Sequence, residues 1–383
     1  MRVRTMSKVL LGEIAIERKE TCKGNKNGFP IVGLEHLTPE QVTLSDWDED
    51  RSNTFTKLFY EGDILFGRRR AYLKKAAVAP FNGICSGDIT VIKAIPERIL
   101  PELLPFVIQN DSFFQYAVGK SAGSLSPRVK WEYLRNYEFE LPNLDKQREL
   151  AKVLWAMEET KIPYMNLLKR IDELVKGHFV QMFGDPVTNS YDCQVVTFKN
   201  YIKNIRYGTS QPPKFSDDGP YKFIRATNIK DKHITENDML FISLEEAEKI
   251  EKCKLNGNEL LMVRSGANTG DTCIITDPYR GHYAGYDIII TFDLSRANPV
   301  FFNELLNTNY MDQIVKPLTA RAAQPHINAQ QVQSLPMIVV PIEAQNIFAQ
   351  FVEEAEKFKF ELQHTLVDLI ELNKKIIADA FID

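Results

Sequence analysis

The chain has 383 residues, of which 44% are hydrophobic and 26% are charged, and its formal net charge is −4 at pH 7. This composition excludes a disordered or collagen-like chain, and the length favours two globular domains over one. No stretch approaches the run of about 18 apolar residues that a membrane-spanning helix needs, and the N-terminus has no signal-peptide core. We therefore expect a cytoplasmic protein without a membrane partner.

The cysteines are odd in number and never occur as Cys-x-x-Cys. This pattern favours neither a disulfide framework nor a zinc knuckle, so we expect no metal site and reduced, mostly buried thiols. They are Cys22, Cys85, Cys193, Cys253 and Cys273.

The first part of the chain has a helical or mixed stretch, then short strand-like runs separated by turn residues, and then a helical stretch. These elements are expected at 8–16, 64–66, 76–79, 89–92 and 101–118. Such an order is typical of an α+β globule with a mixed or antiparallel sheet.

A strongly basic segment without an acidic residue follows the first of these strands. It contains Arg68, Arg69, Arg70, Tyr72, Lys74 and Lys75. Because each cation that neutralises a phosphate releases condensed counterions, the segment suits binding to a nucleic-acid backbone. A solvated basic loop is an equally good interpretation of the segment alone. The net charge does not exclude nucleic acid, since residues 342–383 hold nine acidic residues against four lysines.

A long helical segment begins after Leu141-Pro142, and its apolar residues follow the spacing of a coiled-coil seam. The seam positions are Tyr164, Leu168, Ile171, Val175, His178 and Met182. Because a proline is best tolerated at a helix start, Pro163 predicts a short helix over 145–160 and a longer one from 163. We interpret His178 as a structural histidine.

The same order of elements then returns. A helical or mixed stretch is expected at 194–205, strands at 260–263, 273–275 and 287–292, and a helical stretch at 299–318. A second long helix follows Val340-Pro341, and its apolar residues again follow the spacing of a seam. Its seam positions are Ala355, Phe358, Leu362, Thr365, Leu369, Leu372 and Ile376.

The chain therefore contains a diverged copy of itself, displaced by about 195 residues. The matched blocks are collinear: 29–34 with 221–226, 62–66 with 257–261, 86–90 with 285–289, 124–129 with 322–327, and 140–147 with 339–345. We expect two globules, at 1–141 and 185–340, and two helical regions, at 142–184 and 341–383.

Two homologous globules on two similar helices predict a pseudo-two-fold molecule, with the helices packed as an antiparallel coiled coil and the globules at opposite ends. The predicted helix from Tyr164 to Phe183 would be about 30 Å long. One turn of B-DNA has a similar length, which suggests a molecular ruler.

Motifs of enzymatic sites are absent from the sequence. It has no Asn-Pro-Pro-Tyr or Asp-Pro-Pro-Tyr methyltransferase signature and no P-loop. Glu17-Arg18-Lys19 has nuclease-like spacing without an aspartate ahead of it. The glycine-rich segment 257–270 lacks the strand-to-helix setting of a nucleotide loop, so we interpret it as a turn or a DNA-contact loop.

Several segments resemble type I restriction-modification specificity subunits (HsdS). The openings of the two helical regions at 141–147 and 340–345 resemble that family's Pro-to-Gln motif, and 321–328 resembles the end of its recognition domains. Gly62-Asp63-Ile64-Leu65 resembles its entry into a strand. The resemblance covers essentially the whole chain, and its most specific part is the alternation of globule and helix.

The resemblance implies a non-catalytic subunit whose two target-recognition domains read an asymmetric, bipartite sequence in double-stranded DNA. It implies helices that dock two methyltransferase (HsdM-type) subunits, joined by restriction and translocase (HsdR-type) subunits. No cofactor would belong to this chain, since S-adenosylmethionine, ATP and magnesium would sit in the partners. The alternatives are a self-sufficient DNA-modifying or DNA-cleaving enzyme with a cryptic site, and an adaptor that binds only protein.

We expect DNA contacts in the loops where the two copies differ, since changed loops on a shared fold can read different sequences. An ordinary surface role is as good an interpretation for each residue alone. The candidates are Arg68, Arg69, Arg70, Tyr72, Lys74, Lys75, Arg128, Lys130, Arg264, Ser265, Asn268, Thr269, Arg321, Gln324 and His326. The main candidates for the helical partner surface are Tyr164, Leu168, Ile171, Val175, Phe358, Leu362, Leu369 and Ile376.

Overall fold

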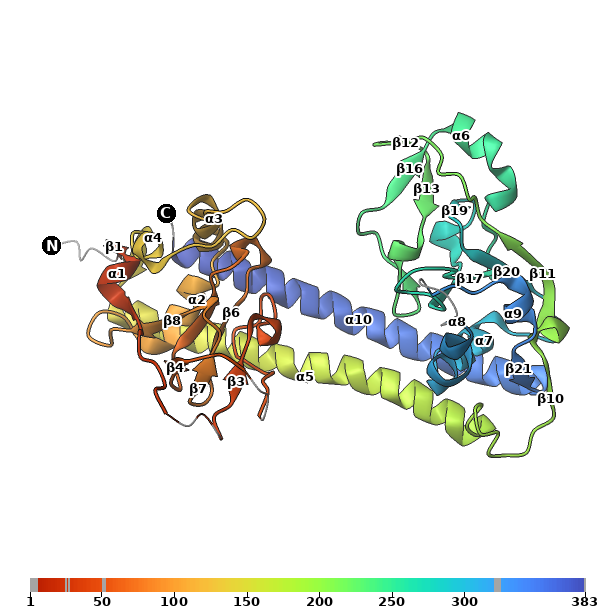
Figure 1. The fold of residues 1–383 in the computed structure, drawn as a ribbon, viewed down its shortest axis with the longest axis horizontal. Helices are drawn as coiled ribbons and strands as arrows, with labels where there is room; N and C mark the ends of the chain where they lie inside the picture. The colour runs from red at the N-terminus through yellow and green to blue at the C-terminus, as the bar shows by residue number, and fades with distance from the viewer. Residues whose placement is uncertain (1–5, 25, 27, 50–52, 320–324, 382–383) are drawn as a thin grey trace. The chain divides into compact units, whose positions relative to one another are not determined.

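The computed structural model describes residues 6–24, 26, 28–49, 53–319 and 325–381. The chain forms two compact units (Figure 1). Unit 1 comprises residues 1–166 and 362–383, and unit 2 comprises residues 167–361. Each predicted globule therefore folds together with one part of each long helix, instead of separately from both helices.

The described residues of unit 1 form three sheets. The first sheet has the strand order β2 (Ala15–Glu17), β8 (Ile89–Ala94), β5 (Ile64–Gly67) and β6 (Ala76–Val78). The second has the order β3 (Ile31–Val32), β7 (Gly83–Cys85) and β4 (Lys57–Phe59). The third pairs β1 (Met6–Leu10) with β9 (Glu138–Pro142). All pairs are antiparallel except β3 with β7. Its short helices are α1 (Leu11–Ile14), α2 (Leu104–Ile108), α3 (Asp111–Gly119) and α4 (Trp131–Leu134), with 3₁₀ turns that include η2 (Ala71–Leu73) and η3 (Pro101–Leu103).

Unit 2 repeats the four-stranded central sheet and the two-stranded sheet of unit 1, but its other sheet has a different strand order and it has an additional hairpin. The central sheet has the strand order β11 (Ile202–Tyr207), β20 (Ile288–Phe292), β17 (Leu260–Met262) and β18 (Thr272–Ile274). The second sheet has the order β12 (Phe215–Ser216), β16 (Leu240–Ile242), β13 (Tyr221–Ile224) and β19 (Tyr283–Ala284). Two further pairs are β10 (Val195–Thr197) with β21 (Pro336–Ile338) and the hairpin of β14 (Ile229–Lys230) and β15 (His233–Ile234). Its short helices are α6 (Leu244–Lys249), α7 (Pro299–Leu306), α8 (Lys316–Thr319) and α9 (Ala329–Gln333). The parallel pair β13 with β19 corresponds to β3 with β7. The internal repeat and the α+β class are thus confirmed.

The central sheets are buried on both faces, which explains their continuous apolar runs. In β5, Ile64 and Phe66 join the large core of unit 1, whereas Leu65 joins a second core on the other face. In β17, Leu260 and Leu261 divide between two cores in the same way.

An ion pair shared by both units shows how the copies align. Arg18 Nε donates to Asp63 at 2.7 Å in unit 1, and Arg206 donates to Glu259 at 2.6 and 2.8 Å in unit 2. Asp63 therefore corresponds to Glu259. The predicted match of Gly62 with Gly257 was wrong by one residue, because Gly62 and Asn258 are the positions with positive φ (82° and 66°). The arginine of Glu17-Arg18-Lys19 thus has a structural role.

The first long helix, α5 (Leu144–Phe183), is continuous through Pro163, so the predicted break was wrong. A proline inside a helix removes one backbone hydrogen bond to the carbonyl four residues earlier. Here Pro163 and Glu159 are both exposed, so water can solvate the freed carbonyl.

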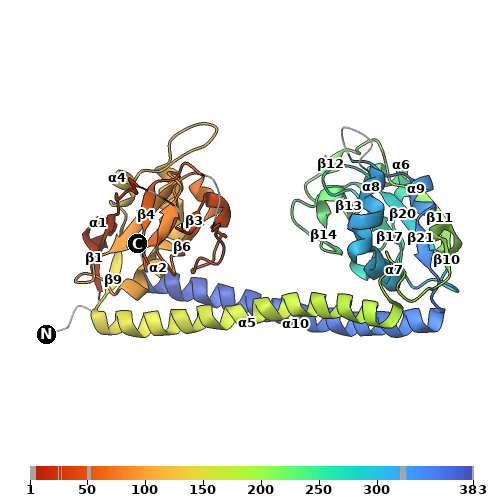
Figure 2. The same cartoon turned by 60° about the horizontal axis from the view of Figure 1, so that its bottom comes forward.

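The second long helix, α10 (Ile342–Ala380), lies beside α5 within each unit (Figure 2). The two run antiparallel, because Asp172 of α5 pairs with Lys359 in unit 2 and His178 packs on Phe351. In unit 1, Glu158 of α5 accepts a hydrogen bond from Asn373 at 2.8 Å.

The predicted seam of α5 agrees with the burial, but that of α10 is partly wrong. On α5, Ile171 and Val175 are buried, and Tyr164 and Leu168 are half-buried. On α10, Leu362 is buried, and Leu369 and Ile376 are half-buried. By contrast, Phe358 is 48% exposed and Leu372 is 52% exposed. Their places are taken by the neighbouring Lys359 and Asn373, whose side-chain nitrogens donate to Asp172 and Glu158 of α5.

The Pro-to-Gln motifs each bury a glutamine at a helix start. Gln147 accepts from Leu100 N at 2.9 Å and donates to Pro142 O at 2.8 Å. Gln345 accepts from Asn298 N at 2.8 Å and donates to the carbonyls of Arg296 and Val340. The motif therefore ties each long helix to the loop that precedes η3 or α7.

Cys85, Cys193, Cys253 and Cys273 are free thiols, and Cys85, Cys253 and Cys273 are buried. None of the helices in the described ranges has the length and apolarity needed to cross a membrane.

Candidate nucleic-acid interface

Three loops converge in unit 1 at the end of β5. The backbone of Arg68 accepts from Val129 N at 3.0 Å and donates to Asp88 O at 3.0 Å. An isolated bridge joins Arg69 to Arg128. The basic segment, the turn before β8 and the loop 121–130 therefore form one surface.

Asp88 holds two arginines of this surface. Arg128 donates to it from Nε at 2.7 Å and from Nη2 at 3.2 Å, and Arg69 Nη1 lies 3.5 Å away. The hydrogen bonds from Arg128 lower the pKa of the Asp88 carboxyl. Both guanidinium side chains are about two-fifths exposed, and a guanidinium has five donors, so each can also bind a phosphate or a guanine edge.

The rest of the basic segment divides into outward and inward side chains. Arg70 and Tyr72 are exposed, as is Lys130 of the loop 121–130. Lys74 donates to Asp111 at 2.5 Å and Lys75 donates to the carbonyl of Leu34 at 2.7 Å, so both are engaged within the fold.

The backbone of the basic segment is strained at two positions. Arg70 (φ 55°) and Lys74 (φ 50°) adopt left-handed conformations on either side of η2, which are uncommon for residues other than glycine. Strain of this kind persists where the surrounding structure fixes it, and it often marks a functional loop.

Unit 2 builds the equivalent surface around Arg264. Its carbonyl accepts from Ile327 N at 3.0 Å, as that of Arg68 does from Val129, and its N–H donates to Asp287 Oδ1 at 3.1 Å. Its guanidinium lies over the rings of Tyr207 and Tyr286, at 4.6 and 3.9 Å from their centroids.

His326 faces Arg264, with 3.3 Å between Nε2 and Nη2, and a bridge joins it to Ser265. In unit 1, Arg128 holds the corresponding place beside Arg69. The same backbone frame therefore carries an arginine in one unit and a histidine in the other.

The pKa values of the two aspartates shift in opposite directions. Asp287 is 4% exposed, and burial raises its pKa to about 6. Asp88, which has the bidentate arginine, has a lowered pKa. The two units therefore share a backbone arrangement at these loops, but the side chains on it differ in chemistry.

Of the other candidates in unit 2, Ser265 and Asn268 are exposed, whereas Thr269 is buried. The Thr269 hydroxyl donates to the carbonyl of Gly266 or of Pro325, which is a structural role. Arg321 and Gln324 lie outside the described residues.

Sequence reasoning missed Tyr207, Tyr286 and the two aspartates as members of the surface. Asp88 and Asp287 had been aligned with each other, and charged residues at matching loop positions were the available signal. Nothing in the sequence places Tyr207, from the end of β11, beside Arg264.

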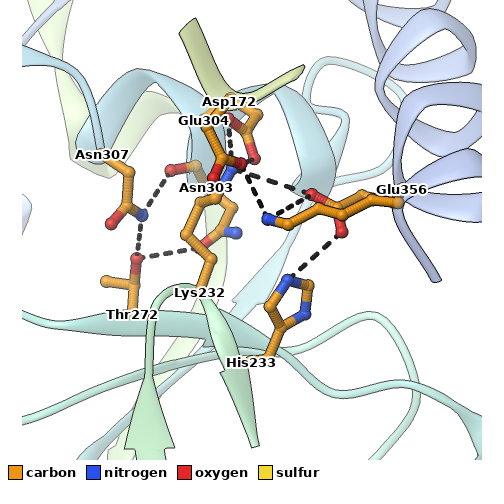
Figure 3. A network of polar contacts seen from close by, with 9 residues as sticks. Asp172, Lys232, His233, Thr272, Asn303, Glu304, Asn307 and Glu356 are labelled. Carbon is orange, nitrogen blue, oxygen red and sulfur yellow. Dashed lines mark hydrogen bonds and ion pairs between the residues drawn. The ribbon is translucent and has the colours of Figure 1, made fainter. Parts of the chain in front are cut away.

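A separate polar network fixes the globular part of unit 2 to the helices (Figure 3). Lys232 donates to both oxygens of Glu304 at 2.9 and 3.0 Å and lies 3.9 Å from Glu356. His233 lies 3.3 Å from the other oxygen of Glu356. Burial raises the pKa of Glu304. The hairpin β14–β15 is thereby joined to α7 and α10.

The part of the network on the left of Figure 3 is neutral. Thr272 donates to Asn303 at 2.8 Å and accepts from Asn307 at 2.8 Å. These groups hydrogen-bond to one another, so the network helps to hold the globular part of unit 2 in place.

The comparisons with known proteins agree with this architecture. A family model for the type I restriction modification DNA specificity domain matches residues 5–174 and 201–372. The EcoDI specificity subunit of Escherichia coli is 25% identical over 167 residues, covering 40% of this chain and 36% of the relative. The EcoKI specificity subunit of Escherichia coli strain K12 is 22% identical over 285 residues, covering 68% and 60%. The matches thus span less than two thirds of either relative.

Two solved structures share the fold. The S subunit of a type I restriction-modification system from M. genitalium has a TM-score of 0.60 at 12% identity, covering 99% of this chain and 96% of that chain. A chain of another type I R-M system has a TM-score of 0.55 at 18% identity, with 99% and 98% covered.

Proposed function

Since the chain belongs to the type I restriction-modification DNA specificity family, whose members are non-catalytic recognition components, we propose that its two units read the two halves of an asymmetric DNA target. One observation carries the proposal: a shared backbone frame holds different side chains. Arg128 and Asp88 form an ion pair in unit 1, whereas His326 and Asp287 stand in the same places in unit 2.

The exposed donors differ in the same way. In unit 1, Arg69 and Arg128 can bind guanine bidentately, while Arg70 and Lys130 are placed for phosphates. In unit 2, Asn268 is exposed and could bind adenine through its amide. Two half-sites of different sequence follow from these two sets.

We also propose that the helices dock the methyltransferase subunits, which the restriction subunits would join. Exposed apolar residues support this proposal, because clusters of them mark interaction sites. On the helical part of unit 2 they include Leu167, Leu174, Phe358 and Phe360, and on that of unit 1 they include Ile162, Met165, Val367 and Leu372. S-adenosylmethionine, ATP and magnesium would be bound by the partners.

A domain exchange tests the division of the target. The chain is assembled with its methyltransferase partner, and methylated adenines are mapped by sequencing. Replacing residues 1–141 with a homologous domain is expected to change one half of the target and leave the other intact. A change in both halves would contradict independent reading, and methylation or cleavage by the purified chain alone would favour the alternative of a self-sufficient enzyme.

Point variants test the two surfaces. Arg264→Ala and Arg128→Ala are each expected to weaken binding of the target duplex about 10- to 100-fold, the usual effect of losing a base-reading arginine. The exposed Arg280 and Arg98, which lie outside these loops, provide matched controls with small effects. Equal losses in all four variants would indicate that only total charge matters.

A further inference from the structure

A groove of about 390 Å³ opens beside the candidate interface of unit 2. It lies between the sheet that contains β12, β13 and β16 and the loops that carry Ser265 and Asp287. Its main lining residues are Phe215, Phe223, Arg225, Ser265, Tyr286 and Asp287. The volume falls within the range of about 300 to 1,000 Å³ that is usual for small-ligand sites.

Aromatic rings form its walls. Phe215 and Phe223 lie 5.5 Å apart between ring centroids, and Phe215 and Tyr286 are each 44% exposed. Exposed rings at a nucleic-acid surface can stack with bases, because every base has a π-face. Tyr286 also contacts the guanidinium of Arg264, so the groove is continuous with the proposed reading surface.

Two charged side chains supply polar contacts. Asp287 is 4% exposed, lines the groove, and has one carboxyl oxygen engaged by Arg264 N. Arg225 donates to Asp238 O at 2.5 Å, while its buried Nε has no hydrogen-bond partner among the described residues. A carboxyl oxygen accepts readily from the exocyclic amino group of a base.

We propose that this groove receives one base of the target, unstacked from the duplex and bearing an exocyclic amino group. The base would stack on Phe215 or Tyr286 and donate to Asp287. This inference rests on the proposed function, because it requires the half-site of unit 2 to lie over Arg264. It concerns that half only, since Phe215 comes from β12, and the described part of the corresponding sheet in unit 1 has three strands.

The test uses the complex with its methyltransferase partner and a duplex containing the mapped target. An abasic nucleotide is placed, in turn, opposite each base of the half-site read by unit 2. At one adenine, cytosine or guanine the dissociation constant is expected to fall about tenfold, because the base no longer has to be unpaired. Ser210 also lines the groove. Ser210→Trp, which fills the groove, is therefore expected to remove this gain, and Phe215→Ala to reduce it.

Leu294→Trp is the matched control, since Leu294 is 59% exposed and does not line the groove. A gain that is absent at every position, that occurs only at thymine, or that persists in Ser210→Trp overturns the inference. Failure of the proposed function has a different signature: Arg264→Ala would then bind the unmodified duplex as tightly as the parent chain.

Discussion

Arg128 donates two side-chain hydrogen bonds to Asp88, at 2.7 and 3.2 Å, whereas in unit 2 a histidine takes the place of Arg128 and Asp287 accepts from the backbone N–H of Arg264. The pKa of Asp88 is lowered and that of Asp287 is raised. The two halves of the repeat should therefore respond to pH with opposite signs.

Asp88→Asn should destabilise unit 1 at pH 7 by about 1 kcal/mol, because the charged hydrogen bonds to Arg128 are weakened. A carboxyl with a lowered folded pKa contributes stability that is present above its unfolded pKa, about 3.9. This contribution is lost as the pH falls through the folded pKa. Hydrogen exchange of β5 and β8 at pH 7 and at about pH 2.5, below the unfolded pKa, measures it, and a difference that grows on acidification would contradict the assignment.

Asp287→Asn should instead stabilise unit 2 above pH 6. Because burial raises the pKa of Asp287 to about 6, the folded state binds the extra proton between pH 4 and 6, and stability falls as the pH rises through that window. The variant is expected to gain about 1 to 3 kcal/mol at pH 8 and nothing near pH 4. Urea unfolding across this range checks the sign. A less stable variant at pH 8 would show that the carboxylate is stabilised by its surroundings.

The repeat and its sheets could be predicted because strands buried on both faces are continuous apolar runs, as in Ile64–Gly67 and Ile288–Phe292. The register of α10 could not be predicted from the sequence. Apolar spacing favours Phe358 and Leu372, and only the facing Asp172 and Glu158 show that a lysine and an asparagine are the buried residues.

The candidate site was predictable in part for a similar reason. A run of cations at 68–75 is visible in one dimension, but the contact of Arg264 with Tyr207 joins residues that are far apart in the sequence. Such contacts depend on sheet topology. The sequence predicts Lys74 and Lys75 as DNA contacts because their intramolecular acceptors, Asp111 and the Leu34 carbonyl, are likewise far from them in the sequence.

Gln345→Ala should destabilise unit 2 by about 2 to 4 kcal/mol. The substitution removes three hydrogen bonds and leaves Asn298 N and two carbonyls without their partner in a buried site. Gln363→Ala, on the exposed face of α10, is the control and should change stability by less than about 0.5 kcal/mol. Chemical denaturation compares the two. Equal effects would exclude a structural role for the Pro-to-Gln motif.

Pro163→Ala should stabilise the chain by about 1 to 3 kcal/mol, since alanine restores the hydrogen bond to the carbonyl of Glu159 and has the highest helix propensity. The measurement is urea denaturation followed by helical circular dichroism. Ile162→Ala, at the adjacent exposed position, separates this backbone effect from any loss of side-chain contact. A destabilised Pro163→Ala would indicate that the proline shapes α5.

Lys359→Met tests whether the buried ion pair sets the alignment of the helices in unit 2. Lys359 is 8% exposed and its partner Asp172 is 42% exposed at the side chain, so water can solvate the carboxylate once the lysine is gone. Replacing a buried charge with an apolar side chain of similar length is often neutral or stabilising, whereas a polar residue in a seam specifies register. Stability should therefore change by less than about 1 kcal/mol, while pairing becomes less specific. Cysteines in place of His178 and Phe351 report the native alignment by crosslinking, because the two rings pack with 4.3 Å between their centroids. The crosslinking yield should fall in Lys359→Met, and Lys357→Met, at an exposed position of the same helix, should leave it unchanged. A full yield together with a large loss of stability would mean that the ion pair holds the helices together without choosing how they align.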